Sequence, residues 1–180
     1  MHDDIKKVLL TKEQIEERVK EMGRQITDDY RGKELVVVVL LSGAAWFAAD
    51  LTRAIDIPLR VDFMVASSYG NGTSTSGSVK VKLDIRENIA GKDVLLVDDI
   101  IDSGVTFAAI SDMLRQNKPA SLKTVALCDK AERRINGLEA DYVGFKIPDE
   151  FVVGFGLDYA GDYRNLPYIG VLKPSVYARK

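Results

Sequence analysis

One stretch limits the possible folds more than any other: an apolar run that ends in two aspartates and continues into a small-residue turn and a helical pattern. The run over 94–97 is too short for an ordinary helix, which indicates a strand buried on both faces. Asp98 and Asp99 close it, a turn over 102–104 follows, and Thr106 is placed to cap the helix. Ligands of open α/β sheets bind at the carboxyl ends of strands, and helix N-termini offer N–H groups to anions. The stretch therefore indicates a site for a phosphate and a polyol, the alternative being an ordinary buried strand with an acidic turn.

This stretch resembles the phosphoribosyl-diphosphate (PRPP) motif of the type I phosphoribosyltransferases, in which two acidic and two hydrophobic residues precede Asp-Ser/Thr-Gly-x-Thr. The resemblance implies an α/β fold with an open, mainly parallel twisted sheet flanked by helices and a small hood built from the C-terminal and N-terminal parts. It also implies that PRPP is bound by Asp98, Asp99, Asp102, Ser103, Gly104, Val105 and Thr106.

Length and composition fit one globular domain over residues 1–180, with a core over about 35–130 and a hood mainly over about 140–172. The net charge is −2 and no run of lysine or arginine is present, so nucleic acid is not an expected partner. We expect no membrane segment and no signal peptide, and Cys128, the single cysteine, excludes an internal disulfide framework. These features predict a cytoplasmic protein.

The single histidine narrows the chemistry. His2 lies at an end that we expect to be mobile, so Ser-His-Asp and Cys-His nucleophiles have no base, and histidine-rich zinc sites have no ligands. Any reaction must use carboxylates, amines, hydroxyls and backbone groups, which suit Mg²⁺ bound together with substrate phosphates.

Local patterns predict the other elements in chain order. They are a helix opened by the Thr11–Gln14 capping box and ending near Gly32, a buried parallel strand over 35–41, a helix over 44–55, a half-buried strand over 59–66 with Leu59, Val61, Phe63 and Val65 on one face, and strands over 79–83, 122–128, 142–146, 151–155 and 168–172.

Two loops are candidates for the pyrophosphate side of the site. Ser42-Gly43 follows a buried strand, where a tight structural turn and an anion site are both possible. The related 6-oxopurine enzymes usually have Leu-Lys-Gly or Leu-Arg-Gly here, so a backbone role is implied without the basic side chain. The loop over 67–78 is long enough for a lid, and the resemblance implies that Ser68 and Tyr69 close over the diphosphate.

The base side rests on a second resemblance, since residues 143–159 are similar to the purine-binding hood of hypoxanthine-guanine phosphoribosyltransferases. It implies that Phe151 stacks on the base, that the Val152 backbone bonds its edge, that Asp158 lies near both base and metal, and that Arg164 reaches the pyrophosphate. Lys130 would donate to the 6-oxo group, because an ammonium has donors only and therefore disfavours adenine.

The implied activity is transfer of 5-phosphoribosyl from PRPP to hypoxanthine or guanine, with Asp102 as general base and Mg²⁺ held by Asp98, Asp99 and Asp158. The resemblance also implies a homodimer or homotetramer. Two alternatives remain: a non-enzymatic PRPP-binding regulator on the same fold, and an unrelated acidic-pocket enzyme such as a phosphoryl-accepting receiver or an aspartate-based phosphatase.

Overall fold

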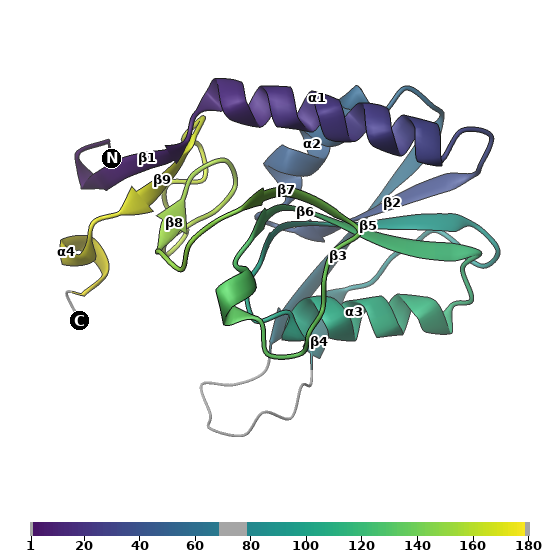
Figure 1. The fold of residues 1–180 in the computed structure, drawn as a ribbon. Helices are drawn as coiled ribbons and strands as arrows, with labels where there is room; N and C mark the ends of the chain where they lie inside the picture. Colours follow the sequence, from purple (N-terminus) through teal and green to yellow (C-terminus); the bar gives the residue numbers. More distant parts are fainter. Residues whose placement is uncertain (1, 69–78, 179–180) are drawn as a thin grey trace.

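A six-stranded sheet forms the centre of the protein in a computed structural model that describes residues 2–68 and 79–178 (Figure 1). The strand order is β4-β3-β2-β5-β6-β7. The strands are β2 (Leu35–Leu41), β3 (Leu59–Ser68), β4 (Val79–Leu83), β5 (Asp93–Ile101), β6 (Ser121–Asp129) and β7 (Tyr142–Lys146). All neighbouring pairs are parallel except β3 and β4, which are antiparallel. The predicted open, mainly parallel α/β sheet is confirmed.

Helices cover both faces of this sheet. Figure 1 shows α1 (Lys12–Asp29) and α2 (Ala45–Ala54) on one face and α3 (Val105–Gln116) on the other. The buried strand β2 contributes to both cores, because its odd-numbered valines pack on the α1 and α2 side and its even-numbered valines on the α3 side. The predicted capping box at Thr11 is confirmed by its reciprocal hydrogen bonds with Gln14. None of the helices in the described ranges is long and apolar enough to cross a bilayer.

A smaller antiparallel sheet forms the hood beside the carboxyl ends of the main strands. Its order is β1 (Ile5–Leu10), β9 (Ile169–Leu172) and β8 (Val152–Val153), and the short α4 (Pro174–Tyr177) follows β9. Within the range expected for the hood, 142–146 joins the larger sheet, while the N-terminal strand joins the smaller one. Short 3₁₀ turns η1 (His2–Asp4) and η2 (Ala131–Arg133) complete the elements. His2, expected to be mobile, shares a hydrogen bond of 2.7 Å with the Tyr168 hydroxyl.

The predicted buried face of β3 is wrong. The expected buried side chains Val61 and Phe63 are 40% and 44% exposed, whereas Asp62 and Met64 are buried. Asp62 accepts hydrogen bonds from its neighbour Phe63 and from the backbone of residues 86 and 87, at 2.8, 2.5 and 2.8 Å. Burial acts to raise the pKa of Asp62, but these backbone donors outweigh it and hold that pKa below the usual value. A satisfied buried carboxylate therefore anchors the connection between β4 and β5.

Candidate active site

The carboxyl ends of β5 and β6 bring the two principal motifs together. The strands are in parallel register, with Ile101 opposite Asp129, and the Lys130 N–H donates to the Ile101 carbonyl at 3.0 Å. Asp102 and Lys130 therefore start from adjacent positions although they lie far apart in sequence. This is the sheet edge at which open α/β proteins bind ligands.

A first cavity of about 220 Å³ lies where β5 passes into α3, and we call it the phosphate cavity. It is lined by Asp98, Ile100, Ile101, Asp102, Ser103, Gly104, Thr106 and Phe107. The prediction that Thr106 caps α3 is wrong, because the N-cap is Gly104 in the left-handed conformation with φ of +83°. No side chain of the described residues caps this helix, although the Val105 N–H lies 3.4 Å from the Ser103 hydroxyl. The first turn thus presents backbone donors toward a potential anion.

A segment from the loop after β6 braces this turn. The Asn136 side chain donates to the Gly104 carbonyl at 3.0 Å, and the Ile135 N–H donates to the Ser103 carbonyl at 3.3 Å. A Cβ at Gly104 would lie 2.6 Å from Asn136 Oδ1 and 2.8 Å from Arg134 Cδ, so the position has no room for a side chain. Arg134 is itself held by a buried ion pair with Asp129. The contacts of this segment with Ser103 and Gly104 join residues about thirty positions apart, so no local spacing pattern could have revealed them.

The adjacent carboxylates at the end of β5 are strongly perturbed. Burial raises the pKa of Asp98 well above its usual range, and the negative charge of Asp99 adds to the effect. Burial also raises the pKa of Asp99, although hydrogen bonds and Arg164 oppose that change. Two crowded carboxylates favour groups that bring positive charge or hydroxyl donors, such as a cation or a ribose.

A second cavity of about 320 Å³ lies beneath the hood, and we call it the base cavity. It is lined by Asp99, Ile100, Asp102, Lys130, Phe151, Val152, Leu157 and Asp158, which include every residue predicted to contact the purine. Lys130 is only 8% exposed, and its Nζ lies 3.6 Å from Asp149 Oδ1. Phe151 is 39% exposed, which is unusual for so large an apolar ring. The cavity therefore offers an ammonium, a ring and carboxylates to one ligand.

Asp102 lines both cavities, so it stands between the phosphate cavity and the base cavity. Its Oδ1 lies 2.7 Å from Arg133 Nε, an ion pair whose alignment does not qualify as a hydrogen bond. Arg133 also lies 3.4 Å from Asp149, which is the partner of Lys130. Arg133 carried no predicted role, and an arginine in the turn after a strand gives no signal for one.

The turn at Ser42 and Gly43, which is expected to bind pyrophosphate, lies against Asp99. A Cβ at Gly43 would lie 1.7 Å from Asp99 Oδ2, so the backbone of this turn packs directly on the acidic pair. The Leu41–Ser42 peptide bond is cis. Ser68 is the final residue of β3, and Tyr69 lies outside the described residues, so the predicted lid stays a prediction.

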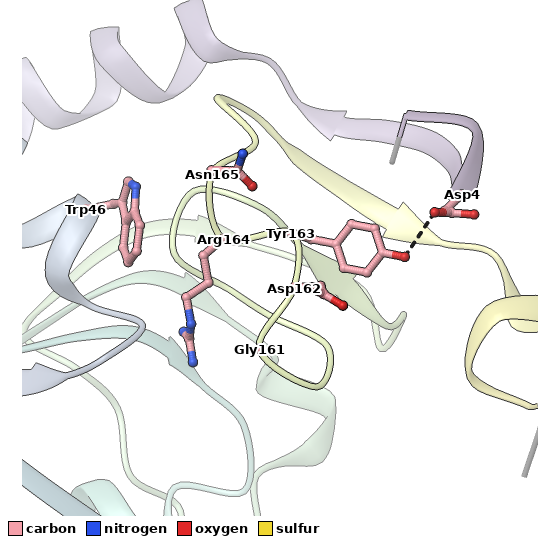
Figure 2. A pocket seen from close by; sticks show the side chains of 7 residues that line it. All are labelled: Asp4, Trp46, Gly161, Asp162, Tyr163, Arg164 and Asn165. Carbon is pink, nitrogen blue, oxygen red and sulfur yellow. Dashed lines mark hydrogen bonds between the residues drawn. The ribbon is translucent and has the colours of Figure 1, made fainter.

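Arg164 projects from the loop before β9 and borders a third, open cavity of about 530 Å³ (Figure 2). Its guanidinium contacts Asp158 Oδ1 at 2.8 Å and the Gly156 carbonyl at 2.5 Å. Trp46 of α2 lies across this cavity, and Tyr163 is held by a 3.0 Å hydrogen bond to Asp4. Arg164 therefore contacts Asp158 of the base cavity, and its positive charge acts on Asp99 of the acidic pair.

The donor set permits a metal but does not form a complete cage. Asp98 borders the phosphate cavity, whereas Asp99 and Asp158 border the base cavity. Among the described residues, no group of three or more histidine, cysteine, aspartate or glutamate side chains could hold an ion by itself. The carboxylate oxygens suit Mg²⁺, which commonly takes one or two protein carboxylates and fills its other positions with water and substrate phosphates.

Comparisons with known proteins agree with this geometry. The family model described as "Phosphoribosyl transferase domain" matches residues 7–160. A curated hypoxanthine-guanine phosphoribosyltransferase of Staphylococcus aureus strain Mu50 is 52% identical over 178 residues, which cover 99% of both chains. The bifunctional protein TilS/HprT of Listeria innocua is 51% identical over 99% of this chain, and the chain spans only 28% of the length of that relative.

A solved structure agrees as well. The crystal structure of a hypoxanthine phosphoribosyltransferase from Staphylococcus aureus superposes with a TM-score of 0.96 at 52% identity, covering 98% of this chain and 96% of the other. The motif at the end of β5, the two adjoining cavities and these matches lead to one assignment: the chain belongs to the phosphoribosyltransferase family.

Proposed function

We propose that the protein is a purine salvage enzyme that transfers the 5-phosphoribosyl group of PRPP to N9 of hypoxanthine, guanine or both, giving IMP or GMP and pyrophosphate. The observation that carries this proposal is that Asp102 forms a wall shared by the phosphate cavity and the base cavity. A bond between sugar and base must form where two such sites meet. The close relatives named as hypoxanthine-guanine phosphoribosyltransferases support the same reaction.

The sugar phosphate occupies the phosphate cavity. Backbone N–H groups over 102–106, together with the hydroxyls of Ser103 and Thr106, hold the 5-phosphate at the start of α3. Asp98 and Asp99 accept hydrogen bonds from the ribose hydroxyls, and both carry perturbed pKa values that such donors relieve. The pyrophosphate leaves toward the backbone of Ser42 and Gly43 and toward Arg164.

Mg²⁺ fits the same position as a cofactor that arrives with PRPP. Asp98, Asp99 and Asp158 would hold it, and the ion would neutralise negative charge on the departing diphosphate.

The purine occupies the base cavity. Phe151 stacks on the ring, the Val152 backbone and Asp158 bond its edge, and Lys130 donates to the 6-oxo group. As the N9–C1′ bond forms and the bond from C1′ to pyrophosphate breaks, Asp102 accepts the proton from N7. Positioning supplies most of the rate, and the proton transfer contributes roughly 10²–10⁴-fold.

The direct test is the initial rate with PRPP, Mg²⁺ and each of hypoxanthine, guanine, xanthine and adenine. We expect IMP or GMP formation with a 6-oxopurine and little product from adenine. Binding of PRPP without turnover of any base would instead favour the regulator. A covalent phosphoaspartate formed with a small phosphoryl donor would favour the receiver or phosphatase alternative.

The enzyme is proposed to form a homodimer or homotetramer. The exposed apolar side chains Val61 and Phe63 of β3 and Leu83 of β4 lie on one face of the sheet, beyond the cover of α1 and α2. An apolar face of this kind suits a second protein surface. Light scattering after size exclusion should give a multimer, and Phe63→Lys should reduce its mass. Ile135→Lys, another exposed apolar position, is the control and should leave the mass unchanged.

A cytoplasmic location goes with these substrates. PRPP and nucleotides carry several negative charges, which do not cross a bilayer unaided, so the enzyme belongs in the compartment that contains them.

A further inference from the structure

Tyr177 of the C-terminal helix α4 stacks on Phe151, the ring proposed to hold the purine. The two ring centroids are 4.9 Å apart and the planes are inclined by 21°, which is a stacked arrangement. Tyr159 contacts the same phenylalanine edge-on, with a centroid distance of 5.6 Å and an angle of 86°. Aromatic pairs at these distances stabilise each other beyond the area that they bury.

The stack adjoins the base cavity. Phe151 lines that cavity, whereas Tyr177 does not, although its side chain contacts Phe151 closely. Tyr177 occupies one face of the phenylalanine ring without lining the cavity, so the other face is left for a ligand. A purine in the cavity would meet the other side, giving three successive rings.

The backbone around Tyr177 is well anchored. The Leu172 N–H donates to the Phe151 carbonyl at 2.8 Å, which ties the end of β9 to the residue that carries the ring. The next residue, Lys173, donates its N–H to the Asp4 carbonyl at 2.9 Å. The Ala178 N–H then closes α4 by donating to Pro174 at 2.8 Å. These bonds fix the position from which Tyr177 reaches Phe151.

We propose that Tyr177 is a positioning residue for purine binding: it holds the half-exposed Phe151 ring in the orientation that stacks on the base. The proposal rests on the role given above to Phe151. A ring that is already oriented loses less conformational freedom when the base binds. The smaller entropy cost should appear as a higher affinity for the base. PRPP is proposed to bind in the phosphate cavity, on the opposite side of Asp102, so its affinity should not change.

The test compares Tyr177→Ala with Tyr177→Phe in the full-length enzyme. The alanine variant should raise the KM for hypoxanthine roughly two- to ten-fold, the range expected for loss of one aromatic pair. The KM for PRPP and kcat should stay within about two-fold of the parent. Tyr177→Phe should behave as the parent, because the proposal needs the ring and not the hydroxyl.

A double-mutant cycle with Phe151→Ala separates this proposal from the base-binding role itself. If Phe151→Ala leaves the KM for hypoxanthine unchanged, the proposed role of Phe151 fails. If Phe151→Ala raises that KM and Tyr177→Ala does not, only the role of Tyr177 fails. If the proposal is correct, Tyr177→Ala should not raise the KM for hypoxanthine further in the Phe151→Ala background.

Two further outcomes would overturn the proposal. A lower KM for hypoxanthine in Tyr177→Ala would mean that the tyrosine obstructs the base. A loss of kcat with unchanged KM would mean that it merely stabilises the fold.

Discussion

Replacing Lys130 by methionine removes the buried ammonium from the base cavity while it keeps a side chain of similar length. The change should not strand a carboxylate, because Asp149 retains its second partner, Arg133, at 3.4 Å. The main loss is then the hydrogen bond from a charged donor to the 6-oxo group. Such bonds contribute about 1.5–3 kcal/mol, which corresponds to roughly 10- to 150-fold in kcat/KM for hypoxanthine.

Adenine should respond differently, because its amino group cannot accept from the ammonium. The kcat/KM for adenine should stay the same or rise, so the ratio of hypoxanthine to adenine should fall by at least ten-fold. Initial rates at saturating PRPP, with products separated by chromatography, give both values. Lys146→Met is the matched control, since Lys146 is an exposed lysine of β7. An equal loss for the two bases, or an unchanged ratio, would refute the proposed recognition.

Three other substitutions probe the rest of the site, and a fourth, Gly91→Ala, is the control for the glycine replacement. Asp102→Asn should lower kcat by roughly 10²–10⁴-fold while IMP binding measured by calorimetry persists, and unchanged turnover would exclude it as the base. Asp98→Asn should abolish PRPP binding yet raise the unfolding temperature. The pKa of Asp98 is raised in the folded protein, so its ionised carboxylate destabilises the fold. This loss of stability is absent at acid pH and grows as pH rises through that pKa. The gain should therefore appear at pH 8 and vanish near pH 3, and a gain independent of pH would contradict this cause. Gly104→Ala should raise the KM for PRPP at least ten-fold, because the methyl group meets Asn136 and Arg134. Gly91→Ala, with φ of +73° and nothing within 4 Å, should show only the backbone cost of about 1 kcal/mol in urea unfolding.

Features encoded locally could be predicted from the sequence. The apolar runs of β2 and β5 are buried on both faces, so they contain no alternation to misread. The motif over 98–106 specifies its own strand, turn and helix. Cys128 is buried in β6, and burial raises the pKa of its thiol, which agrees with an inert strand residue.

Features that depend on distant partners could not be predicted. The orientation of β3 depends on how far α2 extends over the sheet and on donors from residues 86 and 87, which satisfy Asp62. The contacts of Gly104 with Arg134 and Asn136 join the start of α3 to a loop far along the sequence. The pairing of Tyr177 with Phe151 joins α4 to the hood, and the sequence around each residue gives no indication that the two rings are in contact.

The position of β9 between β1 and β8 has a consequence during synthesis on the ribosome. The strand β1 pairs with β9 and so must wait until residues 169–172 have been made, whereas the turn after β5 and the segment that braces it end at residue 136, about thirty residues earlier. A nascent chain could therefore form its sugar-phosphate cradle while the roof over the purine is still missing. The proposed nucleobase site is therefore completed later in synthesis than the proposed phosphate site.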